Sequence, residues 1–181
     1  KGKELEAYFN EVAEHSPFPV ILYNVPKFCG IEIPLDTVAK LSEHPNIIGM
    51  KDSSGNLSYF QSMIGLHLKK FQLLVGNANT LMLSLVMGAS GGVLALANIA
   101  PQICLDIYQA VSKGQIEKAR KLQLSIIWLN QLITTVYGIG GLKYALDQIG
   151  MFGGKPRKPL PLPDNHGKTE IQKELKKLKL I

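Results

Sequence analysis

Two stretches decide the fold: PVILYNVP at residues 19–26 and NIIGMKDS at residues 46–53. Both are short, mostly continuous apolar runs that end in polar or proline residues. A strand covered on both faces of a parallel sheet has this pattern, whereas a half-exposed strand alternates. Two later runs repeat it, FQLLVGN at 71–77 and GGVLALAN at 91–98. The sequence therefore predicts four buried parallel strands.

Helical patterns fill the intervals between these runs, which predicts an α/β fold with right-handed crossovers. An amphipathic stripe precedes the first strand and consists of Leu5, Phe9, Val12 and Ala13. Further helices are expected over 35–43, 57–69 and 78–88. After Pro101 the pattern is helical only, with helices predicted over 101–112, 115–136 and 139–150, a Pro-rich connector GGKPRKPLPLP, and a basic helix over 168–179.

The net charge of +6 is concentrated at the C-terminal end of the chain. Residues 155–181 hold eight Lys and Arg against three Asp and Glu, a net charge of +5, so the rest of the chain carries only +1. A nucleic-acid-binding body would spread basic residues over one face, so we expect no nucleic-acid partner. No uncharged apolar run reaches the roughly 18–20 residues of a membrane span, so we expect no membrane partner.

The cysteines and histidines give no sign of a metal site. Cys29 and Cys104 stand far apart in the chain without a partner motif, which favours a reducing compartment over a disulfide scaffold. The four histidines lack the short spacings of metal ligands, so no metal is expected. The stretch GASGG at 88–92 follows a predicted helix and precedes a predicted strand, the reverse of a serine-hydrolase elbow.

Lys51 is the most unusual residue, because it ends an apolar strand. Side chains alternate along a strand, so Lys51 shares its face with Gly49, and this small neighbour would leave space for a ligand. An apolar setting disfavours the charged form of an amine, which can then attack a carbonyl. Tyr23 ends the preceding strand, one βα unit earlier, and would lie at the same rim, where it could relay protons. A solvated lysine and an ordinary half-buried tyrosine remain the alternatives.

Three further residues follow strand ends at the same rim. Gly76 ends the third strand, where it would let a substrate approach the backbone, although a tight turn explains it equally well. Ser53 and Asn77 would supply a hydroxyl and an amide group, with helix capping as the alternative for each. We predict Lys51 and Tyr23 as catalytic residues, with Gly76, Ser53 and Asn77 binding substrate.

The pair YNVP and GMKDS, separated by one βα unit, resembles the dihydrodipicolinate synthase and N-acetylneuraminate lyase family of Schiff-base TIM barrels. The segments LLVGN and GASGGVLALAN follow in the family's order. Within the family, HPNIIGMKDSSG, ALAN, GQIEKARKLQ and YGIGGLK are most similar to members that cleave 4-hydroxy-2-oxoglutarate. This resemblance runs from residue 3 to about residue 160.

The resemblance implies an enzyme, a class I aldolase that cleaves 4-hydroxy-2-oxoglutarate to pyruvate and glyoxylate. Lys51 would form the imine with the 2-oxo acid, Tyr23 would transfer protons, Gly76 would contact substrate through its backbone, and Ser53 would line the site. No cofactor is expected, because the imine itself accepts the electrons. The resemblance also implies a homo-oligomer and the mitochondrial matrix, or the cytoplasm if the source is a prokaryote.

Two residues and the length depart from the family pattern. Phe28 stands where dihydrodipicolinate-forming members carry an arginine, and Cys29 stands where a small hydroxyl residue or alanine is usual. A complete barrel needs eight βα units in about 250 residues. We therefore expect residues 1–100 to form units five to eight, a C-terminal half barrel, followed by helices over 101–154 and the connector and basic tail over 155–181.

The absent first half would carry the loop that binds the 2-oxo acid's carboxylate, and a half barrel would leave strand edges and an apolar inner face open. Because the chain opens with Lys1 in a helical pattern, we expect a fragment or shortened product of a longer chain. Three functions stay open. They are an active aldolase, a dihydrodipicolinate synthase-like enzyme that condenses pyruvate with another aldehyde, and a non-catalytic half barrel that binds a subunit partner.

Overall fold

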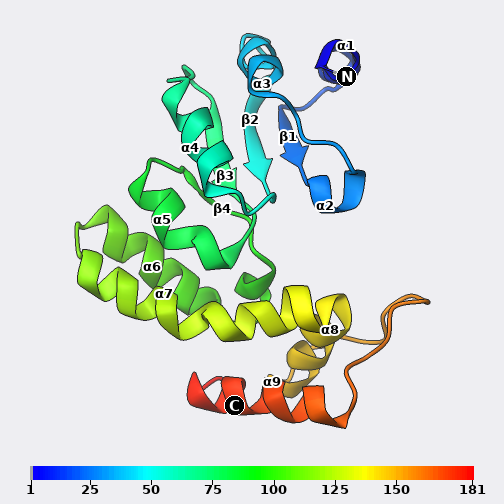
Figure 1. Cartoon of the computed structure of the whole chain (residues 1–181), viewed down its shortest axis with the longest axis vertical. Coiled ribbons are helices and arrows are strands. Elements are labelled where there is room, and N and C mark those ends of the chain that lie inside the picture. The colour runs from blue at the N-terminus through cyan, green and yellow to red at the C-terminus, as the bar shows by residue number, and fades with distance from the viewer. Residues whose placement is uncertain (1) are drawn as a thin grey trace. The chain divides into compact units, whose positions relative to one another are not determined.

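The computed structural model describes residues 2–181, so Lys1, the first residue of the predicted barrel segment, lies outside the described residues. The chain divides into two compact units, Lys1–Val93 and Leu94–Ile181 (Figure 1). The first unit holds the strands and the second is helical. Within residues 2–181, no helix has the length and apolar character that a bilayer crossing requires.

The first unit alternates helices and strands, as the sequence predicts. Its elements in chain order are α1 (Gly2–His15), β1 (Val20–Asn24), α2 (Pro26–Cys29), α3 (Leu35–Leu41), β2 (Ile47–Asp52), α4 (Leu57–Gly65), β3 (Gln72–Val75), the 3-10 turn η1 (Ala78–Thr80), α5 (Leu81–Val86) and β4 (Gly91–Gly92). The strands form one sheet in the order β1-β2-β3-β4, and every pair is parallel. This sheet confirms the predicted α/β class.

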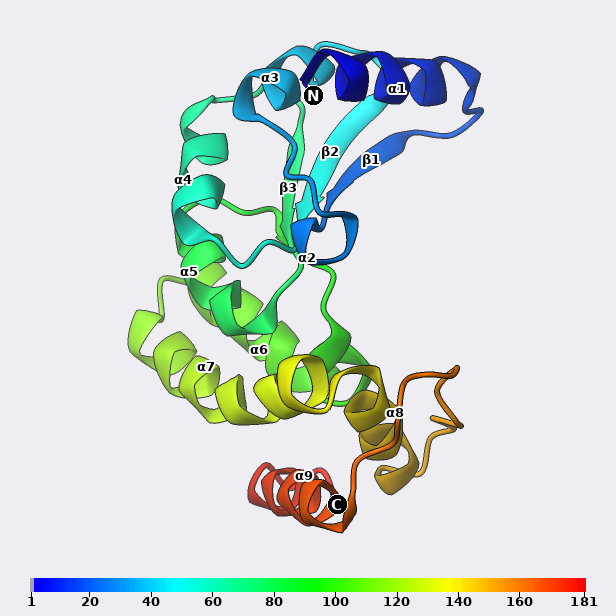
Figure 2. The same ribbon diagram turned by 45° about the vertical axis from the view of Figure 1, so that its right-hand side comes forward.

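The helices cover one face of this sheet, and α3 and α4 lie along the same side of it in Figure 2. Leu22 and Met50 point to the covered face and are fully buried. Ile21 and Tyr23 point to the other face and are 45% and 48% exposed. The strand pattern's prediction that both faces are covered is therefore wrong for the described residues, whereas the open inner face expected of a half barrel is confirmed. Four strands do not close into a barrel, so the face that would line its interior stays open.

The fourth predicted strand is much shorter than expected. Only Gly91–Gly92 pair with β3, and the rest of the apolar run turns into the 3-10 helix η2 (Ala95–Asn98) of the second unit. Leu96 in η2 is fully buried, which explains why the run is apolar although it is not extended. A second difference is the short helix α2, which the sequence did not predict and which begins at Pro26 and ends before Gly30, whose φ of 67° suits glycine.

The second unit is a set of packed helices: η2, α6 (Pro101–Ser112), α7 (Ile116–Gln131), the π-helical turn η3 (Leu132–Val136), α8 (Gly138–Gln148) and α9 (Asn165–Lys177). Its core includes the fully buried side chains of Ile126 and Leu129 in α7. The basic helix α9 is not solvated all round, because Ile171 is fully buried and Tyr137 Oη donates a 2.7 Å hydrogen bond to Glu170 Oε2.

The one-sided burial of β1 predicts unequal costs for two neighbouring substitutions. Leu22→Ala removes a fully buried side chain and should cost about 2–5 kcal/mol of unfolding free energy. Ile21→Ala removes a half-exposed side chain and should cost about 1 kcal/mol or less. Urea unfolding followed by hydrogen exchange in β2 and β3 measures both. Equal costs would contradict the open face. Fluorescence is unsuitable, because the single tryptophan, Trp128, belongs to the second unit.

Candidate active site

The structure brings Tyr23 and Lys51 together. Each lies near the C-terminal end of its strand, and the two are direct partners in the parallel pairing of β1 with β2. Their side chains therefore lie on the same, open face of the sheet. Lys51 Nζ lies 4.3 Å from the centroid of the Tyr23 ring. The spacing of one βα unit along the chain thus placed an amine directly against an aromatic phenol.

The ring of Tyr23 holds the Lys51 ammonium by a cation–π contact, which is worth about 0.5–1 kcal/mol at an exposed site. Among residues 2–181, no carboxylate lies within ion-pair distance of this nitrogen. Lys51 is only partly buried, so the expected apolar enclosure is incomplete in the described residues. An amine without a fixed anionic partner is free to bind a ligand carbonyl.

Gly49 serves a different purpose from the one predicted. A Cβ atom added there would overlap the backbone carbonyl oxygen of Gln72, its partner on β3. The glycine therefore permits the close approach of two strands. The prediction that it leaves space for a ligand is not supported by this geometry.

Gly76 and Ser53 are neighbours at the same rim. The Gly76 N–H donates a 2.7 Å hydrogen bond to the Asp52 carbonyl, which continues the ladder one residue beyond β3. A Cβ at Gly76 would overlap Ser53 Oγ, so the glycine lets the serine hydroxyl lie against the backbone. The Ser53 N–H in turn donates a 2.8 Å hydrogen bond to the Asn24 carbonyl.

Asn77 takes part in a local cap. Its Oδ1 accepts a 3.0 Å hydrogen bond from the Asn79 N–H at the start of η1. Its backbone carbonyl accepts hydrogen bonds from the N–H and the Oγ1 of Thr80, at 3.2 and 3.1 Å. The structure thus gives Asn77 the capping role that was the alternative to substrate binding.

Two residues that the sequence did not single out lie directly behind the candidate pair. Asn24 and Asp52 follow Tyr23 and Lys51, point to the covered face, and are 1% and 3% exposed. Asn24 Nδ2 donates a 2.7 Å hydrogen bond to Asp52 Oδ1. The signal was available, because these polar residues end apolar strands with the same spacing along the chain as the candidate pair.

This buried pair extends to the loops above it. The Ile33 N–H donates to Asn24 Oδ1 at 3.1 Å, and Ser54 donates to Asp52 through its N–H and its hydroxyl. Tyr59 Oη donates to the Ile33 carbonyl. Burial, with a further contribution from the charge of Asp52, raises the pKa of Tyr59 far above its ordinary value, so the phenol stays a hydrogen-bond donor.

Phe28 and Cys29 lie in α2, directly after β1, and both are exposed. Phe28 is 76% exposed, and the nearest cation recorded at its ring is Lys27, with 5.8 Å between Nζ and the ring centroid. Cys29, which departs from the family pattern, is the last residue of this short helix. Phe28 therefore presents an uncharged ring at the position where a cation was expected in dihydrodipicolinate-forming relatives.

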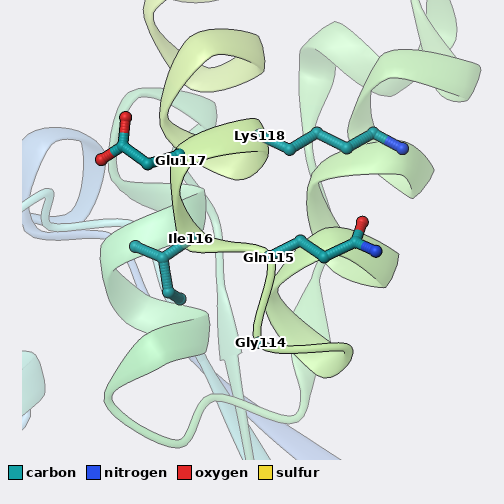
Figure 3. Close-up of a pocket in the computed structure, with 5 residues that line it drawn as sticks. All are labelled: Gly114, Gln115, Ile116, Glu117 and Lys118. Atoms are coloured by element: carbon teal, nitrogen blue, oxygen red, sulfur yellow. The ribbon is translucent and has the colours of Figure 1, made fainter.

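The second unit contributes a separate surface pocket at the turn between α6 and α7 (Figure 3). Its lining consists of Gly114, Gln115, Ile116, Glu117 and Lys118, all exposed, with side chains that point in different directions. It contains none of the candidate residues, and nothing in its lining converges on a ligand. In the part of the chain that the structure describes, no three His, Cys, Asp or Glu side chains gather as a metal site.

Comparison with known proteins agrees with this geometry. Residues 1–178 match the dihydrodipicolinate synthetase family. The 4-hydroxy-tetrahydrodipicolinate synthase of Methanopyrus kandleri is 34% identical over 175 residues, which cover 96% of this chain and 58% of that protein. The dihydrodipicolinate synthase of Aquifex aeolicus superimposes with a TM-score of 0.90 at 26% identity, covering 99% of this chain and 62% of that one.

A third similar structure is the chloride-inhibited dihydrodipicolinate synthase of Acinetobacter baumannii in complex with pyruvate, with a TM-score of 0.90 at 26% identity. The matched region covers 100% of this chain and 62% of that one. The chain thus spans about 60% of the length of these relatives. Its four parallel strands and the helices that follow them form the C-terminal half of a (β/α)8 barrel with an appended helical segment. The chain belongs to the dihydrodipicolinate synthetase family.

Proposed function

We propose that this chain carries the catalytic lysine and tyrosine of a Schiff-base lyase that acts on a 2-oxo acid. The observation that supports this proposal most strongly is the placement of Lys51 Nζ over the Tyr23 ring at the C-terminal rim of a parallel sheet. Active sites of (β/α)8 enzymes lie at this rim. A related synthase has been solved with pyruvate, a 2-oxo acid.

Lys51 is the nucleophile in this proposal. Its amine adds to the C2 carbonyl of the 2-oxo acid, and loss of water gives a protonated imine. For 4-hydroxy-2-oxoglutarate, the C4 hydroxyl loses its proton, the C3–C4 bond breaks, and its electrons move onto the imine nitrogen. Glyoxylate leaves, and the remaining enamine takes a proton at C3. Hydrolysis of the imine then returns Lys51 and releases pyruvate.

Tyr23 is the proton carrier in the same scheme. Its ring lies against Lys51 Nζ and its side chain is half exposed on the open face, so its phenol can reach a group bound to the lysine. The phenol would give and take the protons of the addition and cleavage steps. Ser53 and Gly76 would line the substrate's path at the rim, through the serine hydroxyl and the glycine backbone.

Two substrates compete within this scheme. Phe28 counts against the synthase reaction, because the resemblance places an arginine at this position in dihydrodipicolinate-forming members and Phe28 offers no positive charge there. The names of the relatives favour the synthesis of 4-hydroxy-tetrahydrodipicolinate from pyruvate and an amino aldehyde. We propose the cleavage reaction, in a homo-oligomeric enzyme of the mitochondrial matrix. The open face of the sheet favours a third role, in which a half barrel without catalytic activity binds a subunit partner.

Imine formation is tested first by chemical trapping. Pyruvate and borohydride should attach a reduced pyruvate group to Lys51, and mass spectrometry of peptides should place it there. Lys51→Arg should abolish the adduct, whereas Lys118→Arg, an exposed control on α7, should leave it unchanged. The same assay is run on a chimera in which the N-terminal strands of the Methanopyrus kandleri relative precede residues 2–181. Absence of the adduct in the chimera would contradict the proposal, and an adduct in the chimera alone would favour an inactive half barrel.

Removing the phenol tests Tyr23. Tyr23→Phe keeps the ring and its contact with Lys51 but deletes the hydroxyl group. In the active chimera we expect kcat for cleavage to fall by about 10²–10⁴-fold, the usual contribution of a general acid–base group. The KM for substrate should change little, because the ring remains. An unchanged kcat would exclude Tyr23 as the proton carrier.

Replacing the uncharged ring of α2 tests the choice of substrate. In the chimera, Phe28→Arg should increase turnover of aspartate semialdehyde relative to glyoxylate, because it restores the cation that the resemblance places here in dihydrodipicolinate-forming members. Lys27→Arg, next to it on α2, is the matched control, since it changes no charge. Preference of the unmodified chimera for aspartate semialdehyde would instead support the synthase reaction.

A further inference from the structure

The hydrogen bond between Asn24 and Asp52 lies directly behind the candidate lysine and tyrosine. Strand side chains alternate between faces, so each catalytic candidate is followed in the chain by a member of this buried pair. Both pairs are direct partners in the register of β1 and β2: Tyr23 with Lys51, and Asn24 with Asp52. Movement of one pair must therefore move the other.

The polar atoms of the buried pair are committed to partners in the first unit. Asn24 donates to Asp52 and accepts from the Ile33 N–H, so it ties the end of β1 to both β2 and the loop before α3. Asp52 also accepts the hydroxyl of Ser54 at 2.8 Å and its N–H at 3.2 Å. A slip of one residue would carry the pair to the open face and Lys51 to the covered one. The loss of these buried bonds opposes such a slip.

The backbones of the same two residues close the strand ends. The Asn24 carbonyl accepts the Ser53 N–H at 2.8 Å, and the Asp52 carbonyl accepts the Gly76 N–H at 2.7 Å. Two residues therefore join the ends of β1, β2 and β3 through side chains and backbone together. Lys51 directly precedes Asp52 on β2, at the strand end that these two bonds join to β1 and β3.

On the open face, the candidate lysine has much weaker support. The contact that the structure records for Lys51 Nζ is the Tyr23 ring at 4.3 Å, and among residues 2–181 no carboxylate forms an ion pair with it. Its long side chain carries several free rotations. The orientation of the two backbones, rather than a salt bridge, thus decides where the amine lies relative to the phenol.

We propose that Asn24 and Asp52 are positioning residues, whose buried hydrogen bond fixes Lys51 against Tyr23 from the opposite face of the sheet. This inference deepens the proposed function and rests on the role that it gives to Lys51. Neither residue touches substrate. Loosening their bond lets the strand ends rotate and takes the ring of Tyr23 away from the amine.

The test exchanges the two buried groups within the full chain. Asn24→Asp places two carboxylates together and removes the donor of the pair, and Asp52→Asn replaces the carboxylate by an amide and removes its charge, so each single change weakens the pairing at nearly constant volume. The double change, Asn24→Asp with Asp52→Asn, restores one amide and one carboxylate in reversed positions. Asn46→Ala is the matched control, because it deletes part-buried hydrogen bonds to the Ala13 and Ser16 carbonyls at the opposite end of the sheet.

The first readout needs no substrate. Limiting acetic anhydride labels free amines, and mass spectrometry gives the labelling of Lys51 relative to the exposed Lys118. Losing the hold of the Tyr23 ring should raise this ratio about two- to fivefold in each single variant, the size expected for one cation–π contact. The double variant should return to the ratio of the unmodified chain. Asn46→Ala should lower the melting temperature without changing the ratio.

Single variants that fold and label Lys51 as the unmodified chain does would overturn the inference, and so would a double variant that fails to restore the ratio. If a single variant does not fold, Asn24→Ala replaces it, since this change deletes the hydrogen bond to Asp52 and introduces no charge. A rise in Lys51 labelling there supports the inference, and an unchanged ratio overturns it.

A second readout separates this inference from the proposed function. Each variant is also introduced into the chimera and trapped with pyruvate and borohydride. Suppose that Lys51 labelling rises in the single variants and returns in the double variant, but the unmodified chimera traps no pyruvate. This result would refute the proposed function and leave the positioning role of Asn24 and Asp52 intact. If all variants trap pyruvate at the same rate and label Lys51 equally, the positioning role of Asn24 and Asp52 is refuted and the proposed function stands. When both hold, trapping should slow by roughly 10- to 100-fold in the single variants, as expected for a displaced reacting group.

Discussion

The register of β1 against β2 is the constraint on which the site depends. It makes Tyr23 a partner of Lys51 on one face and Asn24 a partner of Asp52 on the other. The covered face stabilises this register, because leaving a buried polar group without a hydrogen-bond partner costs about 1–3 kcal/mol of folding free energy. The open face supplies the chemistry, since an amine and a phenol meet there without a competing salt bridge among the described residues. The residues that hold β1 and β2 together and the residues proposed for catalysis therefore lie on opposite faces of the same two strands.

Much of this arrangement could be predicted from the sequence. Apolar runs at a spacing of about one βα unit require parallel strands whose C-terminal ends meet at one rim. The spacing between Tyr23 and Lys51 therefore predicts that the two side chains lie close together. The alternating helices and the helical second unit follow from the same reasoning, and the family match over residues 1–178 agrees with it.

Other features could not be predicted, for physical reasons. A run of apolar residues reports that a segment is buried, but it does not say whether the segment is extended, so η2 resembled a strand. Gly49 is small because Gln72 of the next strand lies against it, a tertiary contact that no local pattern records. Asn24 and Asp52 stand out in the sequence as polar residues that end apolar strands, but the contact between their side chains depends on the register of β1 against β2.

The central proposal is that Lys51 is the amine that condenses with a 2-oxo acid beside Tyr23. A crystal structure of the borohydride-reduced pyruvate adduct tests this most directly. We expect continuous electron density from Lys51 Nζ to C2 of the bound group, on the open face and within reach of the Tyr23 hydroxyl. Density for the adduct on a different lysine, or a Lys51 side chain directed among the covering helices, would contradict the proposal.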